Sequence, residues 1–151
     1  MPTATSSIKI DLSSENNTEE LAVKISKKLK LGNIVFLYGE MGVGKTTFVK
    51  YLIKEFLRAN KLKQIEVVSP TFNLLNEYQI GKTKINHYDL FRLKSNEELK
   101  NLDLFGDKQK SITLIEWPQI INEKPKNLIE FTFEYKENYE KRSVHIKGLD
   151  L

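Results

Sequence analysis

A glycine-rich run between an apolar segment and an amphipathic segment constrains this chain more than any other feature. Residues 39–46 read GEMGVGKT and match the pattern G-x-x-x-x-G-K-[ST] at every fixed position. Glycine lets the backbone curl until successive N–H groups point inward at the start of a helix, which creates a site for an anion. Lys45 supplies a compact cation for phosphate oxygens, and the Thr46 hydroxyl is a ligand for Mg²⁺. The run therefore predicts a phosphate-binding loop, or P-loop.

The segments on either side of the run support this prediction. Residues 34–38, IVFLY, form a continuous apolar stretch, as expected for a strand buried on both faces. The apolar residues within 48–57 recur on one face of a helix. Glycine makes up about 7% of an average protein, so a chance match in roughly 150 positions has odds on the order of one in a few hundred. We therefore expect the loop to bind a nucleotide through Gly39, Met41, Gly42, Val43, Gly44, Lys45, Thr46 and Thr47.

The first half of the chain alternates between strand and helix patterns. Before the loop, residues 8–12 predict a half-buried strand, and a helix follows whose apolar stripe ends at Leu29. Its possible N-caps are Ser13, Ser14, Asn17 and Thr18. After the P-loop helix, residues 65–68 predict a third strand. It stops at Pro70, because proline cannot donate a hydrogen bond to a strand ladder.

The second half of the chain is richer in hairpins. Residues 73–80 and 84–89 predict two strands joined across Gly81 and Lys82. Ser95, with Glu98 three residues on, predicts the capping box of a short helix. Further strands are predicted at residues 112–115, 128–135 and 143–146, and the last two are predicted to form a closing antiparallel pair. The chain is thus predicted to be a single α/β domain over residues 1–151, a three-layer P-loop NTPase-like fold with a mixed, partly antiparallel sheet between helices.

Composition limits the classes of protein that fit. The 151 residues include no cysteine, which excludes disulfides and thiolate metal sites. The net charge of +4 is low for a dedicated nucleic-acid binder. The longest apolar run, residues 34–38, is too short to span a bilayer, and residues 1–7 contain neither a basic cluster nor an apolar run. We therefore expect a cytoplasmic protein that contacts no membrane.

Two acidic residues end predicted strands, where a P-loop enzyme places a carboxylate near Mg²⁺. Glu116 follows the apolar strand of residues 112–115, and Asp89 follows the less apolar strand of residues 84–88. One carboxylate would hold the metal or its water, and the other would orient the water that attacks the γ-phosphate. The residues alone leave open which does which. Together with Lys45, they are the candidate catalytic groups.

Other polar and aromatic residues give weaker indications. His87 and His145 lie within predicted strands with no partner spacing around them, which favours ordinary structural roles. Arg92 fits either contact with phosphate charge or pairing with a glutamate of the following helix. Trp117 fits equally well as core packing or as a partly exposed platform beside Glu116.

Two common P-loop classes fit the sequence poorly. A GTPase has a D-x-x-G at a strand end and a guanine-reading N-K-x-D. Residues 103–106 match the first pattern, but only after a predicted helix, and nothing matches the second. A small-molecule kinase needs several arginines and a lid that excludes water. This chain has three arginines and no lid insertion.

Four further segments follow the P-loop in a distinctive order. They are SPTF at residues 69–72, HYDLFRL at 87–93, EEL at 97–99 and IEWP at 115–118. With these segments in this order and spacing, the chain resembles the bacterial TsaE (YjeE) family from about Leu12 to Ile146.

The resemblance implies an ATPase subunit of the machinery that makes threonylcarbamoyladenosine in tRNA. In that family the protein works with a TsaB–TsaD pair and hydrolyses ATP weakly alone and better when bound to the pair. Contact with tRNA would then be indirect or weak. Carried over by motif, Thr46 and Glu116 would ligate Mg²⁺, and Asp89 would support hydrolysis.

The resemblance also indicates residues outside the P-loop. Residues 69–71 would form a switch-like loop near the γ-phosphate. The family's N-terminal segment and a late arginine approach the nucleotide, which indicates Glu15 and Arg142 here. Two alternatives to the ATPase reading stay open. One is a nucleotide-gated binding module in which hydrolysis is incidental, and the other is a small P-loop kinase.

Overall fold

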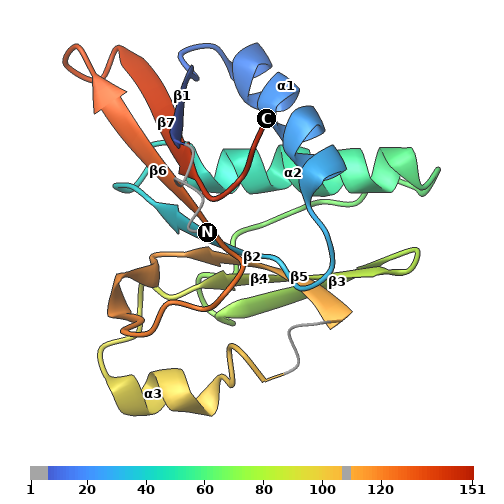
Figure 1. Cartoon of the computed structure of the whole chain (residues 1–151), viewed down its shortest axis with the longest axis vertical. Helices are drawn as coiled ribbons and strands as arrows, with labels where there is room; N and C mark the ends of the chain where they lie inside the picture. The colour runs from blue at the N-terminus through green and yellow to red at the C-terminus, as the bar shows by residue number, and fades with distance from the viewer. Residues whose placement is uncertain (1–6, 107–109) are drawn as a thin grey trace, which may run out of the picture.

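The computed structural model describes residues 7–106 and 110–151, which form a seven-stranded mixed sheet with helices on both sides (Figure 1). The strand order is β1-β7-β6-β2-β5-β4-β3. The strands are β1 (Ser7–Asp11), β2 (Ile34–Tyr38), β3 (Leu75–Ile80), β4 (Thr83–Asp89), β5 (Ser111–Glu116), β6 (Leu128–Lys136) and β7 (Lys141–Lys147). The helices are α1 (Glu15–Lys28), α2 (Lys45–Ala59), α3 (Asn96–Asn101) and the 3-10 helix η2 (Pro118–Ile120).

Each face of the sheet has its own apolar layer. Helices α1 and α2 cover one face, where Phe48 and Leu52 of α2 are completely buried, and α3 lies on the opposite side (Figure 1). On that side Phe36 and Ile115 belong to a second buried cluster, against which Leu99 of α3 packs. The arrangement confirms the predicted α/β fold of three layers with a sheet between helices.

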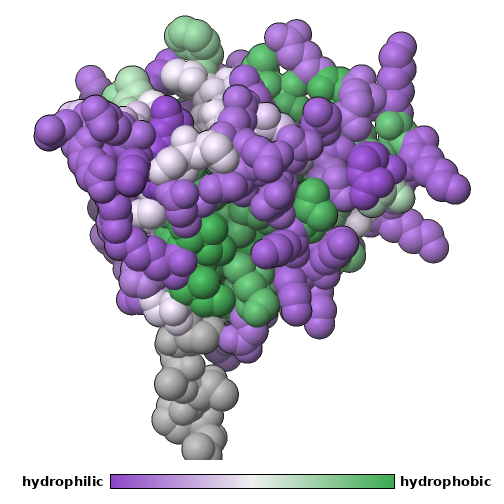
Figure 2. Space-filling model, turned by 90° about the horizontal axis from the view of Figure 1, so that it is seen from above, coloured by the Kyte–Doolittle hydropathy of each residue, from purple (hydrophilic) through white to green (hydrophobic). Residues whose placement is uncertain are grey.

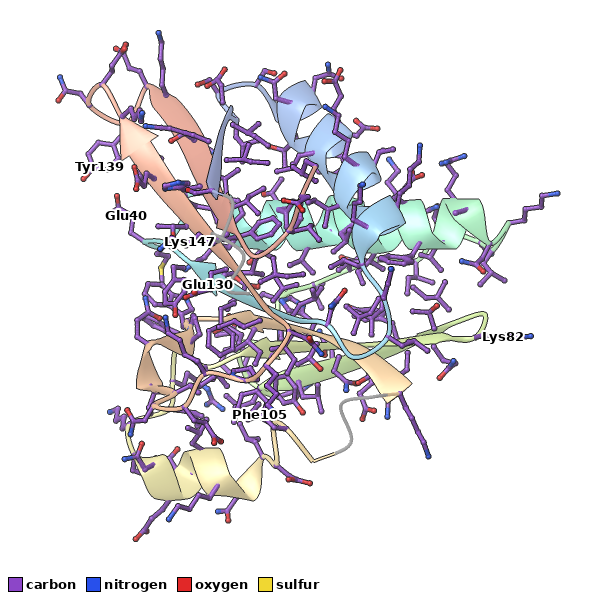
Figure 3. The ribbon with its side chains drawn as sticks, in the orientation of Figure 1. Glu40, Lys82, Phe105, Glu130, Tyr139 and Lys147 are labelled. Carbon is purple, nitrogen blue, oxygen red and sulfur yellow. The ribbon has the colours of Figure 1, made fainter. Side chains whose placement is uncertain are left out.

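Parallel pairing in the middle of the sheet brings three chain segments together at the carboxyl ends of the central strands. Strand β2 lies between β5 and β6 and is parallel to both, and β4 is parallel to β5. The carboxyl ends of these strands therefore lie together, and they carry the P-loop, Asp89 and Glu116. Figure 3 shows Glu40 of the loop at this end of the molecule and Lys82 of the β3–β4 turn at the other.

The predicted antiparallel pairs and helix caps are confirmed. Strand β3 pairs with β4, and β6 pairs with β7. The Ser95 hydroxyl accepts the Glu98 N–H at the start of α3, and Ser14 caps α1 in the same way.

The surface seen from above in Figure 2 carries mainly hydrophilic side chains, in keeping with the exposed Lys24, Lys27 and Lys28 of α1. No helix within residues 7–106 and 110–151 is long and apolar enough to cross a membrane.

The strand predicted at residues 65–68 is wrong. This segment pairs with no strand of the described sheet, because β3 of the hairpin takes the edge position beside β4. Side chains hold the segment instead: the Asn76 amide donates to the Val68 carbonyl over 3.0 Å. Only Val67 is buried, whereas Ile65 and Val68 are each 51% exposed. Three β-branched residues around Glu66 do not by themselves distinguish a strand from an extended connection.

Candidate functional site

The P-loop conformation depends on glycine at two positions. Gly39 has a φ of +145°, and a Cβ there would lie 2.8 Å from Cγ1 of Val43 and 3.0 Å from the Phe133 carbonyl oxygen. Gly44, with a φ of 118°, is the N-cap of α2, and no side chain caps the helix. The first N–H groups of a helix have no partner within the helix, and no side chain of the described residues caps them here, so they are available to an anion.

A cavity of about 290 Å³ opens beside the loop. It is lined by Met41, Gly42, Gly44, Lys45, Thr46, Thr47, Ser69, Thr71, Asp89, Phe91, Glu116 and Trp117. Most of the predicted site residues therefore share one cavity, together with the switch-like segment. Gly39 and Val43 do not line it. The Gly39 carbonyl accepts a hydrogen bond from Lys45, and the buried Val43 supports the loop from inside.

The Lys45 ammonium lies inside this cavity. Its Nζ donates to the Gly39 carbonyl and lies 3.5 Å from the centroid of the Trp117 ring. The residue is only 4% exposed, and this burial lowers the pKa of Lys45. The carboxylates of Glu116 and Asp89 oppose the shift. A cation held among a carbonyl, a ring face and two carboxylates is available to phosphate oxygens.

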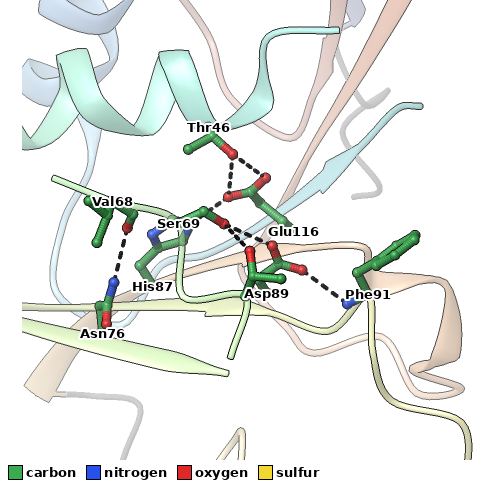
Figure 4. A network of polar contacts seen from close by, with 9 residues as sticks. Thr46, Val68, Ser69, Asn76, His87, Asp89, Phe91 and Glu116 are labelled. Carbon is green, nitrogen blue, oxygen red and sulfur yellow. Dashed lines mark hydrogen bonds and ion pairs between the residues drawn. The ribbon is translucent and has the colours of Figure 1, made fainter. Parts of the chain in front are cut away.

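Three polar side chains meet at the end of β5 (Figure 4). The Thr46 hydroxyl donates to Glu116, with Oγ1 at 2.9 Å from Oε1 and 3.2 Å from Oε2. The Glu116 carboxylate, only 2% exposed, also lies 2.6 Å from Nε2 of His87. The two residues predicted as metal ligands thus lie in direct contact.

Asp89 forms a second polar group beside the first (Figure 4). Its Oδ2 accepts from the Ser69 hydroxyl at 3.0 Å, and its Oδ1 accepts from the Phe91 N–H at 3.0 Å. Thr71 donates to the Ser69 hydroxyl at 3.2 Å. The parallel register places Asp89 directly across from Glu116. The segment around Ser69 is therefore tied to one of the two carboxylates.

A second cavity, also of about 290 Å³, lies along the other side of the loop. It is lined by Leu12, Ser13, Glu15, Thr18, Val43, Gly44, Thr47 and Arg142. Gly44 and Thr47 line both cavities, so the loop separates them. Glu15 and Arg142, which are far apart in the sequence, come together here. The Tyr51 hydroxyl donates to Glu15 over 2.7 Å, and this bond raises the pKa of Tyr51 to about 12.

Two residues outside the candidate catalytic set also contact it. His87 was predicted to be an ordinary structural residue, but it touches Glu116. Its position two residues before Asp89, on the same face of a strand, is the pattern that could have indicated this contact. Trp117 combines the two predicted roles: its ring faces Lys45 and Phe91 in the cavity, and the half-buried side chain also packs against the second buried cluster. Its φ of 58° and ψ of 55° are rare for an aromatic residue and typical of functional sites.

The predicted pairing of Arg92 with a glutamate of the following helix is not found among the described contacts, and its contact with phosphate charge stays a prediction. Its guanidinium donates to the Phe72 carbonyl over 2.6 Å and lies 5.8 Å from the Phe72 ring. The side chain therefore holds the end of the segment that carries Ser69 and Thr71. The Phe72 ring itself is 81% exposed.

Comparison with known proteins gives a consistent result. The family model described as "Threonylcarbamoyl adenosine biosynthesis protein TsaE" matches residues 12–144. A protein of Rickettsia conorii named tRNA threonylcarbamoyladenosine biosynthesis protein TsaE is 43% identical over 110 residues, which cover 73% of this chain and 61% of that protein. The protein of the same name from Aquifex aeolicus is 39% identical over 119 residues, covering 78% and 80%. The one from Nostoc sp. is 34% identical over 131 residues, covering 84% and 78%.

A solved structure shows the same fold. The crystal structure of Bacillus subtilis YdiB superposes with a TM-score of 0.71 at 21% identity, covering 98% of this chain and 89% of that one. The match spans about three fifths of the length of the Rickettsia conorii and Rickettsia felis relatives, 61% and 62%. Since the family model covers most of the chain and several relatives exceed 30% identity, the chain belongs to the TsaE family.

Proposed function

We propose that this chain is a Mg²⁺-dependent ATPase that acts in the biosynthesis of threonylcarbamoyladenosine in tRNA. The observation that carries the proposal is the contact between Thr46 and Glu116 in the P-loop cavity, with Asp89 on the neighbouring strand. The names of the relatives, which refer to tRNA threonylcarbamoyladenosine biosynthesis, support the assignment to this pathway. The chemistry comes from the site, because fold alone does not define function.

Thr46 and Glu116 fit a bound Mg²⁺. The described residues contain no group of three or more histidine, cysteine, aspartate and glutamate side chains able to hold a metal. This suits Mg²⁺, which typically takes one or two carboxylates plus phosphate oxygens. Because the Thr46 hydroxyl donates its hydrogen to Glu116, the lone pairs on Oγ1 are free for a cation. When bound, Mg²⁺ neutralises charge on the β- and γ-phosphates.

Contacts within the site separate the roles of the two carboxylates. Glu116 touches Thr46 and is assigned to the metal. Asp89 touches Ser69 instead and is assigned to orienting the water that attacks the γ-phosphate. Lys45 and the loop N–H groups would stabilise the charge that develops in the transition state.

The cavity of Glu15 and Arg142 suits the nucleoside half of ATP. It adjoins the loop on the side away from Glu116, and it offers a carboxylate, a guanidinium and the apolar Leu12 and Val43. A guanine-reading N-K-x-D is missing from the sequence, in agreement with adenine as the base.

The proposed ATPase has an expected cellular location and expected partners, which follow from the family. We infer a single cytoplasmic domain that works with a TsaB–TsaD pair and contacts tRNA indirectly or weakly. The description of the matching family names threonylcarbamoyl adenosine biosynthesis. Hydrolysis would be slow in the isolated chain and faster with the pair, because completing a P-loop site by a partner is a common way to raise turnover.

The test is Mg²⁺-dependent ATP hydrolysis by the purified chain, alone and with a matching TsaB–TsaD pair. We expect stimulation by the pair, loss of nucleotide binding or turnover in Lys45→Ala, and loss of Mg²⁺-dependent turnover in Glu116→Ala. Wild-type activity in either variant would contradict the site assignment. ATP binding without stimulated turnover would instead favour a nucleotide-gated binding module, which the bonded Ser69–Asp89 segment also suits.

A further inference from the structure

His87 is a completely buried histidine next to the proposed metal ligand. It lies on β4 and is 0% exposed. Its side chain points toward α2, as do those of Ile85 on the same strand and Leu114 on β5, which are both apolar. Nε2 of His87 lies 2.6 Å from Oε2 of Glu116, on a carboxylate that also accepts from Thr46 (Figure 4).

The contacts of the two ring nitrogens define which one carries hydrogen. Nδ1 of His87 is buried and has no hydrogen-bond partner among the described residues. Nε2 faces a carboxylate oxygen, which has only lone pairs to offer. A bare Nε2 there would place two lone pairs against each other. Nε2–H therefore donates to Glu116, while Nδ1 has no partner within residues 7–106 and 110–151.

An ordinary core role does not account for this residue. A buried polar atom without a partner costs free energy, so an apolar side chain would serve packing better at this position. Its neighbours Ile85 and Leu114 show that the layer accepts such residues. Within the part of the chain that the structure describes, the polar contact that offsets the cost is the bond to Glu116.

We propose that His87 is a positioning residue that holds the Glu116 carboxylate against Thr46, so that both oxygen ligands are in place before the divalent cation binds. The inference rests on the proposed function, in which Thr46 and Glu116 hold that cation. Hydrogen bonds from outside the ligand shell orient carboxylate ligands, and losing one typically weakens metal binding 10–100-fold. Binding of the nucleotide without metal should not depend on His87, because His87 does not line either cavity of the P-loop.

The variants are chosen by the reach of their side chains. His87→Gln places an amide N–H as many bonds from Cα as Nε2, so it keeps the donor. His87→Asn is also polar, but its amide is one bond too short to reach Glu116. His87→Leu removes the donor and keeps most of the volume. Thr113→Val is the matched control, since Thr113 is 0% exposed on β5, its Oγ1 has no hydrogen-bond partner among residues 7–106 and 110–151, and it faces the other side of the sheet.

The readout is Mn²⁺ binding to each variant in the presence of ADP, followed by electron paramagnetic resonance, with ADP affinity in EDTA measured beside it. We expect the Mn²⁺ dissociation constant to rise roughly tenfold or more in His87→Leu and His87→Asn. It should stay within about threefold of the original in His87→Gln and Thr113→Val, and ADP affinity in EDTA should be unchanged in all four variants. If His87→Leu does not fold, the Gln and Asn pair carries the comparison.

Two results would overturn the inference. The first is original Mn²⁺ affinity in both His87→Leu and His87→Asn. The second is an equal loss in the Gln and Asn variants that follows their loss of thermal stability, which is the signature of a purely structural role. Glu116→Gln separates this inference from the proposed function. If Glu116→Gln binds Mn²⁺ as tightly as the unmodified chain, Glu116 is not a metal ligand and the proposed metal site is wrong. If Glu116→Gln binds Mn²⁺ more weakly but His87→Leu does not, only the proposed role of His87 is wrong.

Discussion

The Thr46 hydroxyl donates to the Glu116 carboxylate over 2.9 Å, and this bond joins the start of α2 to the end of β5. If both groups hold Mg²⁺, removing the hydroxyl removes one ligand and frees the other. We expect Thr46→Val to lower Mg²⁺-dependent ATP turnover on the order of 100-fold, since a bound metal contributes several kcal/mol and each 1.36 kcal/mol is tenfold. Steady-state hydrolysis across a range of Mg²⁺ concentrations measures this.

The control for that experiment is Thr83→Val, at the opposite end of the sheet in the β3–β4 hairpin. It makes the same chemical change away from the P-loop and should leave turnover unchanged. ADP affinity in EDTA should also be unchanged in Thr46→Val. Unaltered Mg²⁺ dependence in this variant would rule out Thr46 as a ligand.

Gly39 gives a prediction about stability. Ala at this position would place Cβ 2.8 Å from Val43 and keep a φ of +145°, which only glycine adopts readily. We expect Gly39→Ala to lower the free energy of unfolding by about 1–3 kcal/mol, the usual cost of such strain. Denaturant unfolding measures this. The exposed neighbour Glu40 is the control, because Glu40→Ala should change the unfolding free energy by less than about 0.5 kcal/mol.

Trp117 provides an optical readout of the site. It is the only tryptophan, and Lys45 lies 3.5 Å from its ring centroid in the P-loop cavity. A nucleotide whose phosphates draw the ammonium away from the ring will change the surroundings of the indole. We therefore expect adding ATP or ADP to change tryptophan emission in a saturable way. Lys45→Ala should abolish the nucleotide-dependent part, and an unchanged response in that variant would show that the ring reports something else.

Much of this fold could be predicted from local patterns. The caps at Ser14 and Ser95 and the two hairpins each depend on residues close in sequence, and the structure confirms them. The strand and the helix predicted on either side of the P-loop are found as well. The exception is the segment 65–68, where a short apolar run satisfies the strand pattern although β3 takes the edge of the sheet. Which segment occupies the edge of a sheet depends on how well each available segment pairs with the neighbouring strand. The local sequence pattern of one segment carries no information about the other segments.

Site residues that belong to a sequence motif could be predicted, whereas contacts that depend on tertiary packing could not be predicted as well. Glu116 and Asp89 were recognised as strand-end carboxylates, but only their bonds to Thr46 and Ser69 suggest different roles. The contact of His87 with Glu116 depends on the parallel register of β4 and β5. The spacing of His87 and Asp89 places both on one face of β4, but pairing between strands that are distant in sequence is set by the tertiary fold, so spacing alone did not identify Glu116 as the partner.

Arg142 tests the assignment of the second cavity. Its side chain lies on the opposite side of the loop from Glu116, near Gly44 and 5.6 Å from the Tyr135 ring. We expect Arg142→Ala to weaken ADP binding roughly tenfold, because a hydrogen bond to a charged group contributes about 1.5 kcal/mol or more. The Mg²⁺ concentration for half-maximal turnover should not change. Titration calorimetry of ADP with and without Mg²⁺ separates the two effects, and equal ADP affinity in both proteins would place the nucleoside elsewhere.

Tyr51 and Glu15 predict a pH dependence on the alkaline side. The hydrogen bond to Glu15 raises the pKa of Tyr51 to about 12, so the folded state favours the neutral phenol more than the unfolded state does. The stabilisation from this bond is therefore fully present below the ordinary tyrosine pKa of about 10 and is lost as the pH rises toward 12. We expect Tyr51→Phe to be less stable than the original chain below pH 10, with the difference shrinking above it. Urea unfolding at a series of pH values measures the difference, and Glu15→Ala, which removes the acceptor, should reproduce much of it. A difference that grows above pH 10 would have the wrong sign and would show that the Tyr51–Glu15 bond does not form in solution.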